Sequence, residues 1–257
     1  MRTGPADLEV LPVSTTERES LIAEAVPDLA ARTCDCDVLD LLHDLTAHMV
    51  TLLGVRAAGT TVLNEAGEVD FLTASDETCR ELEEDRLELN EGPCVDSARS
   101  GTVLAPVALR GPGPGPRRRP RFTVRALRAG ILGVAAVPLR AGEHTLGTVN
   151  LLSATPDGPT ERDLRLAQVL ADAAGAWLRQ RQVLRTKDGI LGQAEAAPDS
   201  RIVIEQAKGV LAARLGISVE ESFARLRAHA RAQQQRLGDL ATSVARGTVP
   251  PALATAL

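Results

Sequence analysis

The sequence predicts an α+β protein in which an antiparallel sheet with flanking helices is followed by a small all-α bundle of three helices. Two pairs of apolar segments, within 57–75 and within 131–153, flank short turns and predict two β-hairpins. Residues 199–257 instead repeat apolar residues at helical spacing, which predicts the bundle. The 257 residues are enough for one domain of about 150 residues and a smaller second one.

The N-terminal part of the chain is predicted to hold an arm, a helix and a hairpin. Residues 1–34 lack sustained periodicity, and we expect a loose arm with a short helix near 17–25. From Asp37, the sequence DVLDLLHDLTAHMVTLLG places apolar residues at three-and-four spacing and is followed by Gly54 as a stop, which predicts an amphipathic helix. The hairpin of 57–75 comes next, with its turn at NEAG.

The middle of the chain alternates helical patterns with breaks. Residues 76–101 are helical in pattern and are interrupted at Gly92–Pro93, and a short strand, TVLAPV, follows. Residues 110–122 run Gly and Pro together before a cluster of arginines, so they hold neither helix nor strand. We interpret them as a flexible solvated insertion, and the alternatives are a ligand lid or an anion-binding strip.

The second hairpin and a long helix complete the predicted sheet domain. Two apolar strands, 131–139 and 145–153, surround a turn at AGEH. A long helical pattern begins after Pro159, with Thr160 as its N-cap and an acidic residue three positions on. Its apolar stripe, which includes Trp177, suits either a core or a dimer. The order of elements describes an antiparallel sheet with helices covering one face.

The chain divides into four parts. They are an N-terminal arm (1–34), the sheet domain (35–185), a linker (186–198) and the three-helix bundle with its tail (199–257). In the bundle, Gly216 ends the first helix, and Ser218 is the N-cap of a second helix that we expect to end at Gln235. A third helix is expected over about 237–245.

Composition limits the class of function. The net charge is −5, yet residues 199–257 carry eight Lys and Arg against five Asp and Glu, so the bundle is the basic part. No apolar run approaches the roughly 18 residues of a membrane span and no signal segment opens the chain, so we expect a cytoplasmic protein that does not enter a membrane. Four cysteines in a chain of this size agree with a reducing compartment.

Sequence motifs of catalysis and of metal binding are missing. A Walker A loop, H-E-x-x-H and G-x-S-x-G do not occur, and the pair Cys34 and Cys36 has no second ligand pair at metal spacing. We therefore expect no enzyme, no metal and no cofactor. Cys94 is expected to be a small buried residue, and the alternatives are a redox-sensing thiol or a nucleophile.

Several motifs point to known domain families. EGPCVDSARSG (91–101), PRF with a downstream AG (120–130), AVPLR (136–140) and LGTVNLLS (146–153) together resemble a GAF domain of the type common in actinobacterial regulators, over about 37–185. QAKGVLAARLG, SFARLRAHA and RLGDLA resemble an ANTAR domain, the RNA-binding module of transcription antiterminators, over about 199–246. The whole resembles a GAF-ANTAR regulator.

The basic surface of the bundle is the candidate site. On a helical wheel, Arg227, Arg231 and Gln234 fall on one flank of the second helix, Lys208 flanks the buried stripe of the first, and Phe223 is expected in the core. From the residues alone we interpret this as a solvated helix face, and the alternative is a surface that tracks phosphates. The resemblance implies that it binds RNA, with guanidinium forks on phosphates and an amide on a base edge. The RNA-binding residues we expect are Lys208, Arg214, Arg227, His229, Arg231, Gln234 and Arg236.

The resemblance also implies a function for the whole chain. We expect a homodimeric regulator of transcription that binds hairpin RNA in nascent transcripts and causes antitermination, acting indirectly on the RNA polymerase complex. Its GAF domain would take an unknown small-molecule or protein signal, with Phe71, Cys94 and Phe122 as ligand-binding residues. The alternatives are a DNA-binding regulator using the C-terminal helices and a GAF sensor or scaffold acting by protein contacts. A second bundle helix of about 18 residues argues against a helix-turn-helix.

Overall fold

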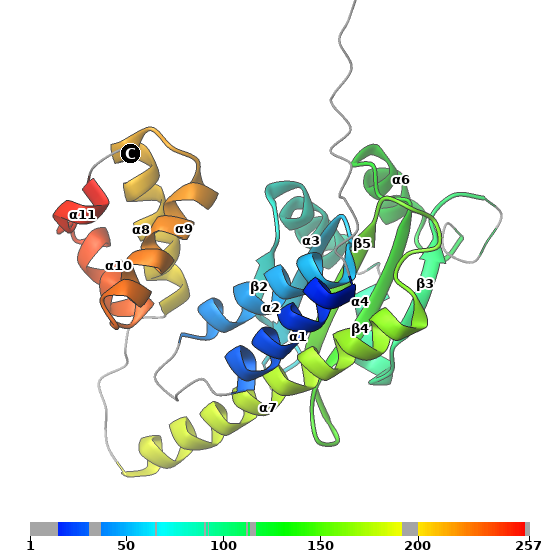
Figure 1. The fold of residues 1–257 in the computed structure, drawn as a ribbon, viewed down its shortest axis with the longest axis horizontal. Helices are drawn as coiled ribbons and strands as arrows, with labels where there is room; N and C mark the ends of the chain where they lie inside the picture. The colour runs from blue at the N-terminus through cyan, green and yellow to red at the C-terminus, as the bar shows by residue number, and fades with distance from the viewer. Residues whose placement is uncertain are drawn as a thin grey trace, which may run out of the picture.

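The computed structural model describes residues 15–30, 37–64, 66–89, 91, 93–111, 113, 117–191 and 200–254. Five strands form one sheet between helices, and the last helices form a bundle (Figure 1). The strands are β1 (Ala57–Leu63), β2 (Val69–Ala74), β3 (Leu104–Ala108), β4 (Gly133–Ala141) and β5 (His144–Ser153). The helices of the first domain are α1 (Thr15–Ala30), α2 (Val38–Leu53), α3 (Glu77–Leu89), α4 (Pro93–Ser100), α6 (Pro120–Arg128) and α7 (Glu161–Leu191). Those of the bundle region are α8 (Ser200–Leu215), α9 (Val219–Ala232), α10 (Leu237–Ala245) and α11 (Pro251–Ala254).

The sheet joins the two predicted hairpins. Its strand order is β2-β1-β5-β4-β3, and each neighbouring pair is antiparallel. β4 and β5 are connected by a tight turn between Ala141 and His144. Gly142 in this turn has a φ of +62°, a left-handed conformation that glycine adopts without strain. β1 pairs with β5, so both hairpins are parts of one sheet, as the sequence predicts.

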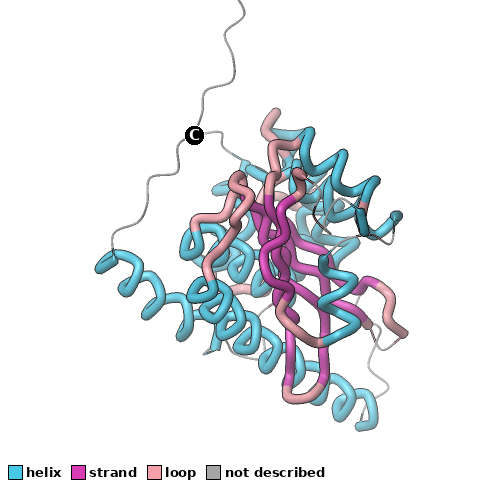
Figure 2. Tube along the Cα trace, turned by 90° about the vertical axis from the view of Figure 1, so that its right-hand side faces the viewer, coloured by secondary structure: helices cyan, strands magenta, loops and turns pink. Residues whose placement is uncertain are grey.

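Helices cover both faces of the sheet, whereas the sequence led us to expect one covered face (Figure 2). One face packs against α1, α2 and α7, and the other packs against α3 and α6. The reason is that neighbouring residues of a strand point to opposite faces, and Ala57 and Ala58 are both buried, with exposures of 2% and 0%. β1 is therefore apolar on both sides and needs cover on both.

Residues 15–30 form α1, which confirms the predicted helix near 17–25, but they belong to the core of the sheet domain, so the expectation of a loose arm is wrong there. α1 packs against α2 and α7, and Ala25 and Leu29 are fully buried in the same cluster. The guanidinium of Arg18 also pairs with Asp163 at the start of α7. The burial of α1 depends on α7, a helix far along the chain, and local periodicity does not reveal such a partner. Residues 1–14 and 31–36, with the predicted Cys pair, lie outside the described residues.

The end of the predicted 110–122 loop is also part of the domain. Arg119 is 4% exposed and its side chain bonds Asp96 of α4. α6 begins at Pro120, where the fixed φ of proline suits a first helical turn. The arginine cluster is therefore not wholly solvated, because one of its members is a buried ion-pair partner. Residues 112 and 114–116 lie outside the described residues.

α7 is a continuous helix of 31 residues, so the first part of the predicted linker, 186–191, is helical. Its start follows the prediction: the N–H of Asp163 donates to the hydroxyl of Thr160 at 3.2 Å, and the N–H of Thr160 donates to the carboxylate of Asp163 at 2.9 Å. Trp177 is 5% exposed in the core cluster, so the apolar stripe serves the core at this point. Residues 192–198 lie outside the described residues.

The bundle is built from α8, α9 and α10, as predicted, and α11 packs on α9. Its core contains fully or almost fully buried side chains from each of the three helices. These include Ile204, Ala207, Leu211, Leu226, Leu240, Ala241 and Val244. Phe223 is 6% exposed in the same cluster, which confirms its predicted place in the core.

α9 ends at Ala232, earlier than the predicted end at Gln235. The N–H of Gln235 donates to the carbonyl of Ala230, and the N–H of Gln234 donates to that of Arg231, the two bonds that close a helix in a Schellman motif. Gln234 has a φ of +50°, in the left-handed region that this motif requires. It therefore leaves the helix and does not share the arginine flank that the helical wheel predicts.

Ser222 ties α9 to α8 and allows a test of the bundle. It is fully buried, and its hydroxyl lies 2.9 Å from the carbonyl oxygen of Lys208 and 2.8 Å from that of Val219. Ser222→Ala removes this donor, and we expect the free energy of bundle opening to fall by about 1 kcal/mol. Hydrogen exchange of peptides from 200–245 should then be roughly fivefold faster. Ser243→Ala removes an exposed hydroxyl and is the control; equal acceleration by both changes would contradict this role of Ser222.

Candidate nucleic-acid interface

α9 positions the two arginines that the sequence singled out. The helix starts after Ser218, whose hydroxyl accepts a hydrogen bond from the N–H of Glu221 at 3.0 Å. Phe223 on the inner side of α9 fixes the rotation of the helix against the bundle core. Arg227 and Arg231 are four residues apart and so project from the same face of α9.

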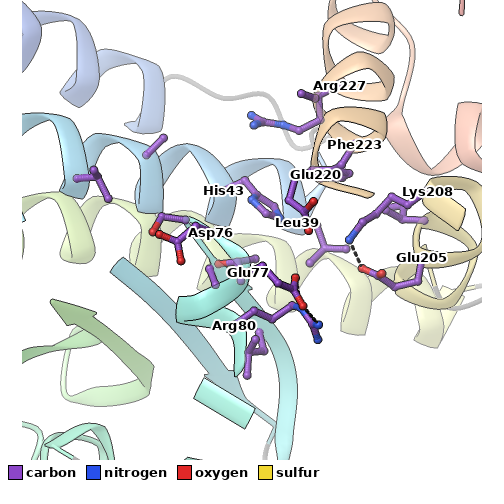
Figure 3. A pocket seen from close by; sticks show the side chains of 18 of the residues that line it. Leu39, His43, Asp76, Glu77, Arg80, Glu205, Lys208, Glu220, Phe223 and Arg227 are labelled. Carbon is purple, nitrogen blue, oxygen red and sulfur yellow. Dashed lines mark hydrogen bonds and ion pairs between the residues drawn. The ribbon is translucent and has the colours of Figure 1, made fainter. Parts of the chain in front are cut away.

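The ring of Phe223 brings the predicted flanks of α8 and α9 together. The Nζ of Lys208 lies 5.2 Å from the centroid of this ring, and the guanidinium carbon of Arg227 lies 5.7 Å from it. Both distances suit a cation–π contact, which holds each cation beside the ring. Lys208 also donates to Glu205 at 2.8 Å (Figure 3). Two cations from different helices therefore share one aromatic anchor.

Two carboxylates of α2 face the arginines of α9. Asp40 and Asp44 are four residues apart, so α2 presents them on one side. The Nε of Arg227 lies 2.6 Å from Oδ1 of Asp40, and its terminal nitrogen bonds Asp44. A terminal nitrogen of Arg231 lies 3.3 Å from Oδ2 of Asp40 and also bonds Asp44. We call these four side chains the aspartate–arginine contact.

The aspartate–arginine contact is largely removed from water. The side chains of Asp40 and Asp44 are 13% and 11% exposed, and that of Arg227 is 18% exposed. The side chain of Arg231 is 51% exposed. Burial alone would lower the pKa of Arg231, but the negative charges of Asp40 and Asp44 outweigh burial and raise that pKa. Arg231 therefore stays fully charged at neutral pH.

Apolar groups of α2 complete the junction with the bundle. Leu39 is 5% exposed and belongs to the core cluster of the bundle. The rings of His43 and Phe223 lie 4.5 Å apart between centroids. A cavity of about 430 Å³ opens beside them, and Figure 3 shows side chains of both domains around it. The junction thus combines ion pairs, one aromatic contact and one buried leucine.

His43 is neutral in this arrangement. Burial is the main reason that its pKa falls to about 3, and the positive charges of Arg227 and Lys208 lower it further. Asp40 and Asp44 act in the opposite direction but do not offset these effects. The unperturbed pKa is 6.5, so the unfolded state takes up a proton at His43 at a higher pH than the folded state does. The contribution of neutral His43 to stability is therefore fully present above pH 6.5 and is lost as the pH falls from 6.5 towards 3.

This lowered pKa predicts a pH dependence of stability. Between pH 7.5 and pH 5.5, we expect His43 to remove roughly 1 kcal/mol from the free energy of unfolding, since protonation favours the separated state. His43→Gln keeps a polar side chain that does not titrate, so the difference between wild type and variant in chemical unfolding at the two pH values isolates this group. His144→Gln changes an exposed histidine and is the control. The same pH dependence in wild type and His43→Gln would contradict the prediction.

The other predicted RNA-binding residues are not grouped with Lys208, Arg227 and Arg231. Arg214 is exposed in the last turn of α8, and His229 is half-buried on α9. Gln234 is exposed between α9 and α10, and Arg236 is exposed at the N-cap of α10. The ion pairs of α9 with Asp40 come from Arg227 and Arg231. The structure therefore gathers Lys208, Arg227 and Arg231 but not the rest of the set.

The three predicted GAF-ligand residues do not form one site. Phe71 is half-buried on β2 and packs on the side of α2 and of the bundle. Phe122 is 1% exposed on α6 and packs on the opposite face of the sheet. Cys94 lies in α4, and its side chain is outside the described residues. Among the described cysteines, burial raises the pKa of the Cys79 thiol to about 12, which makes this thiol unreactive.

The residues of α2 that face the bundle are not among the site residues predicted from the sequence. The sequence predicts an amphipathic helix here and gives no partner for Asp40, His43 and Asp44. Their spacing of three and four is the signal that was available, because it places all three on one side of α2. What this side contacts depends on a segment near the other end of the chain, and periodicity carries no information about that.

Comparisons with known proteins agree with the two-part organisation. The sequence matches the GAF domain family over 37–179 and the ANTAR domain family over 192–244, so the second match includes α8, α9 and most of α10. A comparison with curated proteins gives no significant match. Among the described residues, no helix is both long enough and apolar enough to span a membrane.

Solved structures similar to this chain include several GAF domains. The GAF domain from Acinetobacter phosphoenolpyruvate-protein phosphotransferase is 11% identical, with 66% of this chain and 97% of that chain covered and a TM-score of 0.46. The chromophore-binding domain of a bacteriophytochrome from R. palustris is 9% identical, with 66% and 63% covered and a TM-score of 0.45. A GAF domain from Synechocystis is 18% identical, with 58% and 98% covered and a TM-score of 0.46.

The match to the GAF domain family spans more than half of the sequence. It agrees with the motifs at 91–101, 120–130 and 146–153 and with the five-stranded sheet. The second match agrees with the three-helix bundle. The chain belongs to the GAF domain family and carries an ANTAR domain after its GAF domain.

Proposed function

We propose that this chain is a cytoplasmic regulator of transcription that binds hairpin RNA in nascent transcripts and causes antitermination under the control of its GAF domain. The observation that carries the proposal is the convergence of Lys208, Arg227 and Arg231 on one side of the ANTAR domain. An RNA hairpin held there would form in place of the terminator, so the RNA polymerase complex is affected indirectly.

The chemistry of these side chains suits RNA. Arg227 and Arg231 offer planar forks that bind phosphate through two hydrogen bonds, and Lys208 adds a compact positive charge. Guanidinium planes also stack on the splayed bases of RNA loops, which compensates for the small number of aromatic residues in the bundle. Gln234 is exposed after α9, where its amide can read a base edge.

A homodimer makes the proposal physically reasonable. The segment 199–257 has an excess of three positive charges, which favours modest affinity for RNA by a single domain. Two ANTAR domains in one dimer bind two hairpins of one transcript with a high effective concentration for the second. We propose a small-molecule or protein signal at the GAF domain, and neither an enzymatic activity nor a cofactor is part of the proposal.

Sequencing of RNA crosslinked to this protein in its own cell tests the proposal and identifies the transcripts. Binding of a recovered leader with paired hairpins is then measured against salt concentration, where log affinity should fall by about 0.7 for each phosphate contacted in a single strand. A folded, dimeric protein that binds none of the paired-hairpin leaders would overturn the proposal.

A DNA-binding regulator is the second candidate. α9 has 14 residues, shorter than the 18 or so expected from the sequence, so helix length no longer argues against a helix-turn-helix. Competition between duplex DNA and hairpin RNA for the same labelled leader separates the two candidates. Displacement by duplex DNA at equal or lower concentration than by unlabelled hairpin would favour DNA.

A further inference from the structure

The arginines proposed to bind RNA are engaged by the GAF domain of the same chain. We propose that Asp40 and Asp44 of α2 compete with RNA phosphates for Arg227 and Arg231, so that the GAF domain holds the ANTAR domain in a closed arrangement that cannot bind RNA. This inference rests on the proposed function, because it states how the GAF domain controls that same surface.

The two pairs of side chains match in number, spacing and charge. Asp40 and Asp44 are one helical turn apart on α2, and Arg227 and Arg231 are one turn apart on α9. Each arginine contacts both carboxylates, so two negative charges neutralise two positive ones. A phosphate on an RNA strand needs the same N–H groups that these carboxylates occupy.

The contact leaves little room for RNA beside it. Arg227 uses its Nε and a terminal nitrogen on Asp40 and Asp44, and its side chain is 18% exposed. Lys208, the third cation of the surface, has a side-chain exposure of 14% and pairs with Glu205. Phosphate contact by either residue therefore requires the domains to separate first. Arg231, at 51% exposure, is the accessible member of the set.

The junction between the two domains is also weak enough to open reversibly. Removing Asp40, Asp44 and Arg227 from water costs a desolvation free energy that offsets much of the attraction within the aspartate–arginine contact, so its net contribution is small. The apolar part consists of Leu39 in the bundle core, the half-buried Phe71 packed on that core, and His43 against Phe223. Such a junction favours closure by a small free energy, and RNA or a signal that moves α2 is sufficient to shift the balance.

If only open molecules bind RNA, the apparent affinity equals the affinity of the open form multiplied by the fraction of molecules that are open. If about one molecule in ten is open, removal of the two carboxylate charges strengthens RNA binding by about tenfold. Salt gives a second signature. Salt weakens both the phosphate contacts and the aspartate–arginine contact, so opening partly offsets the loss of RNA binding in the wild type. The slope of log affinity against log salt should therefore be shallower for the wild type than for an open variant.

The test uses the full chain and two matched variants. D40N/D44N removes the two charges and keeps the shape of the side chains. E143Q/D157N makes the same change of net charge at exposed positions of the GAF domain away from α2. Affinity for one paired-hairpin RNA is measured over a range of salt, and small-angle X-ray scattering of the RNA-free proteins reports domain separation independently. We expect D40N/D44N to bind about tenfold more tightly and to be more extended, and E143Q/D157N to resemble the wild type.

The outcomes separate the two proposals. Equal RNA affinity and equal scattering for wild type and D40N/D44N would overturn the competition and leave RNA binding as the function. Equal gains in D40N/D44N and E143Q/D157N would also overturn it, since net charge alone would then explain the effect. If no variant binds hairpin RNA, the proposed function is overturned together with the competition, even where scattering still reports opening of D40N/D44N.

Discussion

Replacement of Arg227 and Arg231 by alanine weakens hairpin RNA binding on the order of 100-fold. A hydrogen bond to a charged group contributes roughly 1.5–3 kcal/mol, and about 1.4 kcal/mol is tenfold in affinity. The same change also breaks the aspartate–arginine contact, so the comparison is made in the D40N/D44N background, where that contact is already absent. Binding measured over a range of salt should also give a slope that is shallower by about 1.4 for two lost phosphate contacts.

A matched control distinguishes the loss of direct RNA contacts from the effect of a lower net charge on RNA affinity. R162A/R165A removes two exposed arginines of α7 in the GAF domain, with the same change of net charge. We expect its affinity to stay within about twofold of the parent, because charges beyond a Debye length are screened. If R162A/R165A and R227A/R231A lose equal affinity, the arginines of α9 act through the general field of the protein and not as RNA contacts.

Glu83→Ala lowers the free energy of unfolding of the GAF domain by about 3–5 kcal/mol, because it leaves the charge of Arg86 buried without this carboxylate. Glu83 and Arg86 are one turn apart on α3, bond each other, and are each 1% exposed. The carboxylate of Glu83 also accepts from the amide of Asn150 on β5 at 3.2 Å. It packs so closely on β1 that a Cβ added at Gly59 would lie 2.7 Å from it.

Chemical unfolding followed by the fluorescence of Trp177 measures this loss. Trp177 is the single tryptophan and is buried in the GAF core, so its signal reports this domain. Glu81→Ala removes an exposed carboxylate of the same helix and should cost less than about 0.5 kcal/mol. The double change E83L/R86M should cost far less than Glu83→Ala, because it removes both charges together. A cost of Glu83→Ala no greater than that of Glu81→Ala would refute this role of the pair.

The elements of the fold were predictable where each depends on its own neighbours. Asp37 caps α2 by accepting from the N–H of Leu39 at 2.9 Å, and Gly54 ends the helix with a φ of +63°. Both signals stand within the segment that they delimit. The hairpin turn at Gly142 is local in the same sense, and so is the Thr160 cap of α7.

The site was predictable in its cations but not in its surroundings. Arg227 and Arg231 followed from helical spacing, but their partner Asp40 is 187 and 191 residues away in the sequence. The GAF resemblance implies that Phe71 and Phe122 bind one ligand, yet they pack on opposite faces of the sheet. Which face a side chain reaches depends on the pairing of distant elements, and a single sequence does not determine it.

α2 belongs to two interfaces at once. Leu41, Leu45 and Met49 are fully buried against the sheet, while Asp40 and Asp44 reach the ANTAR domain. A signal that controls RNA binding through this helix is coupled to RNA by one free energy, and thermodynamic linkage makes such coupling reciprocal. RNA bound to the ANTAR domain must then change the affinity of the GAF domain for its signal by the same factor, so the transcript regulates the sensor as much as the sensor regulates the transcript.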